Sequence, residues 1–464
     1  MAKKELTDKD ISNFSYRDIS SFMGDKDENI TYINHNLTFR DCIFRGRIRY
    51  KTNSTEYNSN SIQKLIQGTL LTPSLIKTFC FINCIFINDF ELIGNDNEPT
   101  KNEIINQRLT FTNCEFIGNF TLNHKIFKEK VKITKCEFHG ECNLESNTFE
   151  KEIRLCGTKF LSKVTFAEST INELIVFSTP TLEDKAIFKE NVSFSQANIN
   201  CEINFSNIKF EKDIAFIETK INNKIYLNKS RIDGSLKIFN ILYIKHPIYL
   251  NDADINNLSI EDSIFENLLI LDDARIENIT IIRCILPLIS LTSVKINKTT
   301  NEETARVLKN EALKGGNTPV ALLMRCEELK QYSNSLEKPK IFSGNISLTF
   351  KKCGKYISEK TPLELMRWSN GYGTKWMRAI VFILTSTFVF FSLFIMLKDG
   401  IGSSLIWGDI NYWKEAAKYI MLFDIAEEMN SINSIPQLIV FLLGKIFILY
   451  GIYQLIAAFR KHGR

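Results

Sequence analysis

Large apolar residues recur every eleven positions through the middle of the chain, and this interval is the strongest constraint on its fold. The first six are Phe116, Phe127, Phe138, Phe149, Phe160 and Ile171. Neither a helix nor a plain strand repeats at this interval, whereas a solenoid built of stacked coils does. Small residues stand two positions before several of them, at Cys114, Cys136, Thr158 and Ser169. Because side chains alternate along an extended backbone, both residues point inward, and the sequence predicts a narrow β-helix.

The same ladder continues almost to residue 298. It is interrupted at 178–183 and slips at Lys245-His246-Pro247, after which the steps are ten or eleven residues. A second alternating apolar pair, such as Ile203 and Phe205, lies between successive ladder residues. Each step of the ladder thus carries two inward-facing pairs, and two steps are expected to make one turn of the solenoid. The sequence therefore predicts coils of roughly 20–22 residues.

Composition excludes several classes of function. The net charge of +5 is too small for a nucleic-acid-binding surface and has the wrong sign for a DNA mimic, so we expect no nucleic-acid partner. The sequence has no nucleophile elbow, no phosphate loop and no converging carboxylate pair, and its five histidines are scattered. We therefore expect neither enzymatic activity nor a cofactor. No signal peptide follows Met1, so the eleven cysteines are expected to be reduced, small core residues.

Two cysteine spacings resemble metal-ligand sets. One is the pair Cys80 and Cys84, and the other is Cys136-x-x-His139-x-x-Cys142. In the solenoid register Cys84 and Cys136 point inward while His139 points outward. The donor groups would not converge, and no metal site is predicted.

Five segments follow from these patterns: a polar N-terminal arm or cap (1–36), the solenoid (37–298), a helical hairpin that would cover its open end (299–336), a linker with an interfacial helix (337–376), and a transmembrane hairpin (377–464). Capping boxes predict that helices begin at Thr300 and Thr361. A short strand is predicted at 346–350. Insertions near 53–70 and 89–107 interrupt the early coils and are the expected places for a partner surface.

Two apolar segments, at 379–397 and about 436–459, are long enough to span a membrane. The residues expected to anchor their ends at the interface are Trp368, Trp376, Arg378, Arg460 and Lys461. Basic residues precede the first span and follow the second, whereas the loop between the two spans is richer in acidic residues. The positive-inside rule therefore predicts that both termini and the solenoid are cytoplasmic.

Lys445 lies near the middle of the second span, where an ionisable residue is costly and indicates function. Two interpretations remain open: its side chain snorkels to the outer face, or it faces an oligomer axis or a water-filled pore. Gly444 and Gly451 predict a face for close helix approach and association of several hairpins, and Gln454 is a further polar candidate. Helical spacing within 412–425 predicts either an interfacial helix or a short re-entrant one.

Residues 37–298 resemble the pentapeptide-repeat proteins, which implies a right-handed quadrilateral β-helix. The segments Arg306-Val-Leu-Lys309, Ser369–Trp376 and Gly451–Lys461 are similar to a bacterial membrane-anchored subgroup with a helical linker and a two-span tail. That family has a period of five or ten, so the eleventh residue of each half-coil here is expected to bulge at a corner.

The sequence suggests two alternative functions. The first is a non-enzymatic scaffold or sensor in the bacterial inner membrane, which oligomerises through its hairpin and binds an unknown cytosolic protein. The second is a pore-forming or channel-like effector, active in stress or phage defence and gated by the solenoid.

Overall fold

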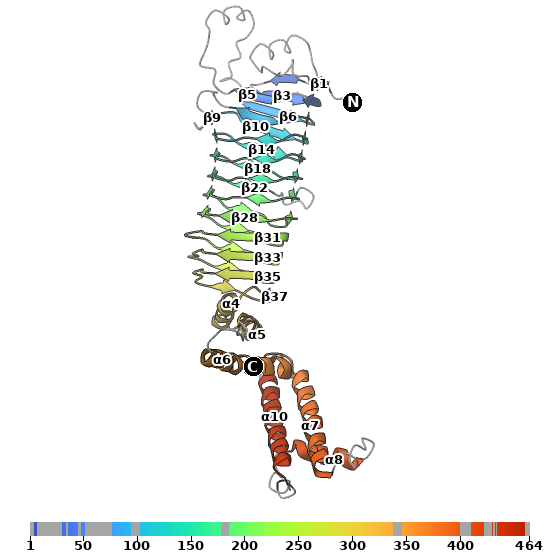
Figure 1. Ribbon diagram of the computed structural model, residues 1–464. Coiled ribbons are helices and arrows are strands. Elements are labelled where there is room, and N and C mark those ends of the chain that lie inside the picture. The colour runs from blue at the N-terminus through green and yellow to red at the C-terminus, as the bar shows by residue number, and fades with distance from the viewer. Residues whose placement is uncertain are drawn as a thin grey trace, which may run out of the picture. The chain divides into compact units, whose positions relative to one another are not determined.

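The computed structural model describes residues 4–6, 30–33, 36–44, 48–51, 77–93, 103–177, 185–336, 346–399, 410–421, 429, 432 and 434–459. It divides into two compact units, a solenoid (Met1–Thr300) and a helical unit (Asn301–Arg464) (Figure 1). The solenoid is a stack of parallel β-coils, and the helical unit contains two long apolar helices. The predicted β-helix followed by helices is therefore confirmed.

Three sheets, here called A, B and C, run along the solenoid, and all their described strand pairings are parallel except one at the N-terminal end of sheet B. Sheet B contains β2 (Ile30–Ile33), β3 (Asn36–Arg40), β6 (Thr78–Ile82), β10 (Arg108–Thr112), β14 (Val131–Thr134), β18 (Ile153–Arg154), β22 (Ile175–Val176), β26 (Ile203–Asn204), β30 (Ile225–Tyr226), β32 (Ile248–Tyr249), β34 (Leu269–Ile270) and β36 (Ile289–Ser290). Sheet C contains β9 (Glu103–Ile105), β13 (Lys125–Phe127), β17 (Thr148–Phe149), β21 (Thr170–Ile171), β25 (Asn198–Ile199) and β29 (Lys220–Ile221).

Sheet A takes two strands from most coils, and in the last coils these merge into single long strands. Its members are β1 (Lys4–Leu6), β4 (Cys42–Phe44), β5 (Ile48–Lys51), β7 (Ile85–Phe86), β8 (Phe90–Ile93), β11 (Glu115–Phe116), β12 (Phe120–Thr121), β15 (Glu137–Phe138), β16 (Cys142–Asn143), β19 (Lys159–Phe160), β20 (Val164–Thr165), β23 (Ile187–Phe188), β24 (Val192–Ser193), β27 (Lys209–Phe210), β28 (Ile214–Ile217), β31 (Arg231–Phe239), β33 (Asp254–Glu261), β35 (Arg275–Ile282) and β37 (Lys295–Thr299). A typical coil, such as β14 to β17, thus has four short strands.

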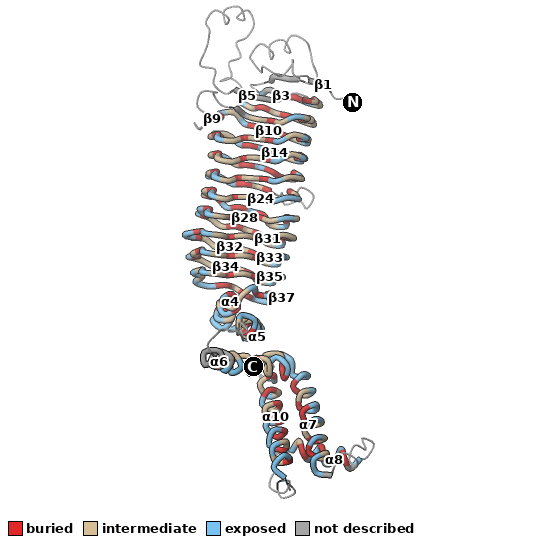
Figure 2. Tube along the Cα trace, in the orientation of Figure 1, coloured by how far each residue is buried: buried red, intermediate tan, exposed pale blue. Residues whose placement is uncertain are grey.

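The eleven-residue ladder fills the interior, as predicted. Its first six residues are all at most 1% exposed and lie alternately on sheets A and C, half a turn apart (Figure 2). On sheet A the phenylalanine rings stack directly on one another. The centroids of Phe116 and Phe138 are 4.5 Å apart, and those of Phe138 and Phe160 are 5.1 Å apart. The small residues at the corners bond to the coil below, since the Ser169 hydroxyl donates to Leu144 O at 2.7 Å.

A left-handed residue marks a corner in coil after coil of the solenoid. Three positions before most ladder residues the backbone has a positive φ, which turns the chain sharply both in the steps of eleven residues and in the steps of ten near the end of the solenoid. Apart from Gly157, these corner residues are Asp41, Asn83, Asn113, His124, Lys135, Ser146, Glu168, Gln196, Asn207, Glu218, Lys229, Asn240, Asp252, Asp262, Asp273, Arg283 and Ser293, with φ between 50° and 62°. Asn, Asp and Ser tolerate this conformation because their side chains bond locally.

Residues in contact on successive coils show how many residues each coil contains. Most regular coils repeat every 22 residues, and the coil with the slip at Lys245-His246-Pro247 takes 23. The last coils take 21 and 20 residues. The predicted coil length and slip are thus confirmed. Longer separations of 42, 30 and 28 residues mark the three insertions.

The insertion at 53–70 lies wholly outside the described residues, and the other insertions lie almost entirely outside them. Within 89–107, Phe90–Ile93 and Glu103–Ile105 are regular strands of the solenoid. In the N-terminal arm, β1 pairs in parallel with β4 and so extends sheet A, while β2 pairs antiparallel with β3.

One corner contains a buried ion pair. The Lys125 ammonium lies 3.0 Å from the Glu103 carboxylate, and their side chains are only 4% and 8% exposed. The Lys125 backbone N–H donates to Asn147 Oδ1 at 2.8 Å, and the Asn147 N–H donates to the Ser169 hydroxyl at 3.0 Å. These four residues occupy the corner position where other coils carry small residues, and they form a continuous polar column inside the solenoid.

The cysteines do not gather into a metal site. Cys136 and Cys142 are buried, whereas His139 lies outside with its Nε2 3.2 Å from Glu115. No group of three potential metal ligands occurs within the described residues. Hydrogen bonding of the neutral Cys84 thiol to Cys114, together with burial, raises the pKa of Cys84 to about 12. Burial raises the pKa of Cys201 to about 11.

We predict that Cys84 and Cys142 resist iodoacetamide at pH 8 in the folded chain. Only the thiolate reacts, and raising the pKa of Cys84 from 9.0 to about 12 reduces its thiolate fraction about a thousandfold. Alkylation followed by peptide mass spectrometry should show rapid labelling of both only in guanidinium. Half-exposed Cys80 is the internal comparison, and labelling of Cys142 as fast as Cys80 would contradict the prediction.

The helical unit contains α4 (Glu302–Lys314), α5 (Thr318–Ser335), α6 (Ile346–Asn370), α7 (Trp376–Asp399), α8 (Ile410–Ile420) and α10 (Ile435–Phe459). Asn301, rather than Thr300, caps α4. The predicted strand at 346–350 and the helix start at Thr361 are wrong, because α6 runs through both and contains Pro362 in its interior. An isolated strand leaves its backbone groups unpaired, whereas a helix pairs them internally.

Candidate functional site

The helix α8 packs against both apolar helices. Tyr412, Ala416 and Tyr419 lie on one face of α8, at helical spacing, and are buried in a cluster with Phe391 and Phe394 of α7 and Phe441 and Ile448 of α10. The Tyr412 hydroxyl is 2.9 Å from the Ser392 hydroxyl of α7. Lys414, Glu415 and Lys418 on the opposite face are exposed. The predicted helix in this segment is thus confirmed.

Lys445 binds the C-terminal end of α8. Its side chain is buried, and Nζ donates to Tyr419 O at 2.8 Å and to Met421 O at 3.2 Å. Carbonyls at a helix C-terminus have no partner within the helix and carry a partial negative charge, which suits a cation. Nζ also lies 4.7 Å from the centre of the Tyr419 ring and 5.2 Å from that of Phe441. The ammonium therefore holds α8 in place within one chain.

The two glycines are required for packing inside the same chain. A Cβ atom on Gly444 would lie 2.2 Å from the Tyr419 hydroxyl and 2.8 Å from Phe390 Cβ. On Gly451 it would lie 2.6 Å from Ile383 Cγ1 of α7. The helices do approach closely at these glycines, but the partners are α7 and α8. Association of several copies stays a prediction, and these glycines do not support it.

Gln454 joins α10 to the turn between α6 and α7. The Asn370 amide donates to Gln454 O at 3.3 Å and also to Gln454 Oε1. Asn370 Oδ1 accepts from the Gly373 N–H at 2.8 Å. Gly371, Tyr372 and Gly373 all have positive φ, between 59° and 88°, and form the turn that separates α6 from α7. The polar groups of Gln454 are thereby used within the hairpin.

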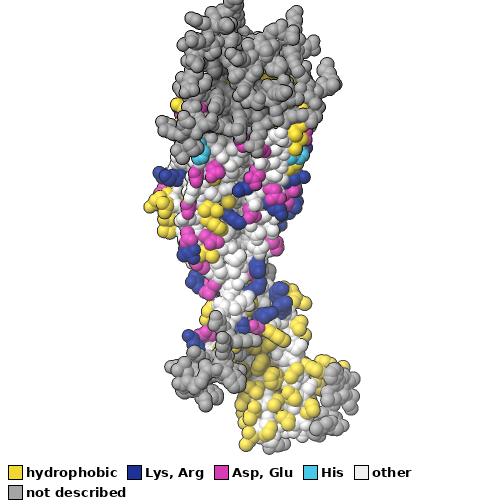
Figure 3. Space-filling view, turned by 45° about the horizontal axis from the view of Figure 1, so that its top comes forward, with side chains coloured by type: hydrophobic (Ala, Val, Ile, Leu, Met, Phe, Trp, Pro, Cys, Tyr) yellow, Lys and Arg dark blue, Asp and Glu magenta, His cyan; other side chains and the backbone are white. Residues whose placement is uncertain are grey.

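The expected interfacial anchors are partly described. Trp368 is 75% exposed, Arg378 is exposed, and the Trp376 ring stacks on Phe459 at 5.7 Å. Arg460 and Lys461 lie outside the described residues. Trp376–Lys398 and Ile435–Phe459 are long and apolar enough to cross a membrane, judged by length and composition alone. Figure 3 shows hydrophobic side chains covering much of this hairpin's visible surface, in contrast to the charged solenoid.

We predict that Gly444→Ala displaces α8. The new methyl group must occupy the place of the Tyr419 hydroxyl, and such overpacking costs about 1–3 kcal/mol. Hydrogen exchange of the α8 amides, measured on the full chain in nanodiscs, should then be about 5- to 150-fold faster. Gly354→Ala is the matched control, because nothing lies within 4 Å of a Cβ there. Unchanged exchange in α8 would show that Gly444 does not control its docking.

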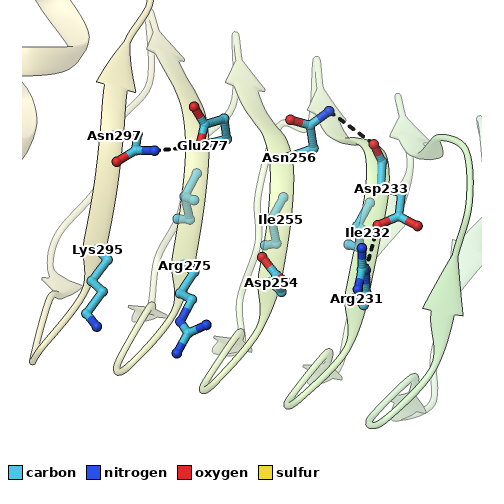
Figure 4. Close-up of a pocket in the computed structure, with 11 residues that line it drawn as sticks. Arg231, Ile232, Asp233, Asp254, Ile255, Asn256, Arg275, Glu277, Lys295 and Asn297 are labelled. Carbon is cyan, nitrogen blue, oxygen red and sulfur yellow. Dashed lines mark hydrogen bonds and ion pairs between the residues drawn. The ribbon is translucent and has the colours of Figure 1, made fainter.

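A second candidate, absent from the sequence-based predictions, is a groove of about 590 Å³ on β31, β33, β35 and β37 (Figure 4). Two rows of polar side chains line it. The first row is Arg231, Asp254, Arg275 and Lys295, and the second is Asp233, Asn256, Glu277 and Asn297. The sequence contains the signal for this groove, because each of these eight residues directly precedes or directly follows a ladder residue.

The chain matches no protein-family model, no curated protein and no solved structure. Two features bear on its function, the hairpin with its bound α8 and the charged outer face of the solenoid. The solenoid offers polar columns at regular intervals, a geometry suited to binding an elongated partner.

Proposed function

We propose that this chain is a membrane-anchored, non-enzymatic scaffold of the pentapeptide-repeat type, whose cytoplasmic solenoid displays binding surfaces to a protein partner. The four-stranded coil with one large and one small inward residue supports the repeat type. The basic ends of the hairpin support the cytoplasmic placement in the bacterial inner membrane. Association into homo-oligomers remains part of the proposal without a defined interface.

The main support is the way the polar groups of the hairpin are used. Lys445 binds the end of α8, Gln454 binds Asn370, and the Gln437 amide donates to Leu397 O at 2.8 Å. These three polar side chains bond to groups of their own chain, where they stabilise its packing, and this supports an anchor rather than a pathway between copies. A scaffold needs an anchor of this kind, whereas a channel with Lys445 on its axis needs that ammonium directed away from its own chain.

Reconstitution of the full chain in liposomes tests this function. We expect the protein to stay with the vesicles in carbonate at high pH, and the vesicles to be as tight to ions as empty ones. Lys445→Leu should leave the vesicles equally tight. An ion flux that grows with protein content and changes in Lys445→Leu would establish the pore instead. Release by carbonate would disprove the anchor.

A further inference from the structure

Charged side chains form a long column on the outer face of sheet A. Residues paired across successive strands follow one another in the order Glu115, Glu137, Lys159, Ile187, Lys209, Arg231, Asp254, Arg275 and Lys295, here called the first column. The second column consists of the residues two positions after those of the first column. It includes His139, Asp233 and Asn297. Like charges on neighbouring strands repel, so each such pair needs a counter-charge.

Two like-charged pairs in the first column are bridged by the second column. Glu115 and Glu137 share His139, whose Nε2 lies 3.2 Å and 3.8 Å from their carboxylates. Lys209 and Arg231 share Asp233, at 3.6 Å and 2.7 Å. In both cases the bridging residue stands two positions after the second member of the pair.

The pair Arg275 and Lys295 lacks this bridge. The equivalent position is Asn297, a neutral residue whose amide donates to Glu277 Oε2 at 2.6 Å. No carboxylate of the described chain lies within ion-pair distance of either cation. Both side chains extend in the same direction, away from Glu277 and Asn297 (Figure 4). Two adjacent cations without an ion-paired carboxylate therefore stand at one end of the groove, and the nearest acid of the first column is Asp254, which neighbours Arg275 on the side away from Lys295.

The other groove residues indicate which anion fits. Arg231, Asp233, Asp254 and Glu277 also line the groove, so carboxylates alternate with its cations. This mixture fits spaced single charges better than a doubly charged phosphate or the continuous negative charge of a nucleic acid. A single carboxylate can lie between the guanidinium fork of Arg275 and the ammonium of Lys295. The amide nitrogen of Asn256 donates to Asp233 O at 3.1 Å, which leaves its Oδ1 and the carboxylate of Asp254 for polar or basic groups beside it. This mixture suits an extended polypeptide with separate acidic side chains.

We propose that this groove docks an acidic segment of the protein partner, with one carboxylate held between Arg275 and Lys295. The proposal rests on the scaffold function and identifies its binding surface. It places that surface in the last coils, rather than at the insertions near 53–70 and 89–107.

The test measures binding of a fluorescein-labelled Gly-Glu-Gly-Glu-Gly-Glu peptide to the full chain in zwitterionic nanodiscs, by anisotropy at low salt. We expect Arg275→Gln and Lys295→Gln each to weaken binding about tenfold, because each removes a charge-assisted contact. Lys209→Gln and Lys159→Gln are the matched controls on the same column. Both lysines already pair with carboxylates, at 3.1 Å and 3.3 Å, so binding should change less than twofold.

Asn297→Asp provides a separate gain-of-charge test. It places a carboxylate at the bridging position and should weaken peptide binding as much as the loss of either cation. Undiminished binding by this variant, or equal weakening in the lysine controls, would overturn the proposal. Displacement of the peptide by inorganic phosphate at lower concentration than by acetate would also overturn it, in favour of a small-anion site. If carbonate released the protein from membranes while peptide binding stayed unchanged, membrane anchoring would be disproved and the binding site would stand.

Discussion

Replacing Lys125 by methionine is expected to destabilise the coils around it by about 3–5 kcal/mol. The substitution leaves the Glu103 carboxylate buried at 8% exposure without its cation, and an unpaired buried charge carries a cost of this size. Hydrogen exchange of the full chain should then be at least a hundredfold faster in the amides of β9, β13 and β17. Coils beyond residue 200 should exchange as before, because a coil contacts only its neighbours.

The matched control removes both charges. In the double variant Glu103→Leu with Lys125→Met the corner becomes apolar, and replacing a buried pair in this way is often neutral or stabilising. We therefore expect exchange close to that of the unmodified chain. If the double variant were as unstable as Lys125→Met alone, the loss would come from packing of the Lys125 stem and not from the unpaired carboxylate.

Replacing Phe138 by alanine should cost about 3–5 kcal/mol. The ring is fully buried and stacks between Phe116 at 4.5 Å and Phe160 at 5.1 Å, so its removal leaves a cavity that the rigid coils cannot close. Exchange of amides in β11, β15 and β19 should accelerate by the corresponding factor, at least a hundredfold.

Ile117→Ala is the comparison for Phe138→Ala. Ile117 directly follows a ladder residue but points outward and is 47% exposed. Its truncation should change stability by about 0.5 kcal/mol or less. Similar losses at the two positions would contradict the assignment of inward and outward faces.

The solenoid was predictable because its signal is local and repeated. Phe116 and the five ladder residues after it each occur in the same setting, so one rule places them all, and the extra corner residue was expected as a bulge. What the rule did not give was the backbone conformation at the corners, where a single left-handed residue such as Lys135 turns the chain. The polar corner column was also detectable, since Lys125 and Asn147 stand where small residues are expected.

The helical unit was less predictable because its details depend on contacts between distant segments. Lys445 is conspicuous in the sequence as an ionisable residue within an apolar span, but its partners Tyr419 O and Met421 O become neighbours only when α8 docks on the hairpin. Likewise, the glycine pair indicated close packing without indicating which helix approaches. The strand expected at 346–350 failed because alternation over five residues does not distinguish an isolated strand from the start of a helix.

The 22-residue repeat of the regular coils gives the solenoid an adjustable length. Neighbouring strands in a sheet are about 4.7–4.9 Å apart, so each added or deleted coil should move everything beyond it along the solenoid axis by about that distance. A duplicated segment such as 131–152, which begins and ends at equivalent points of the coil, would act as a molecular ruler. The spacing between two displayed surfaces could then be set in steps of one strand, without changing either surface.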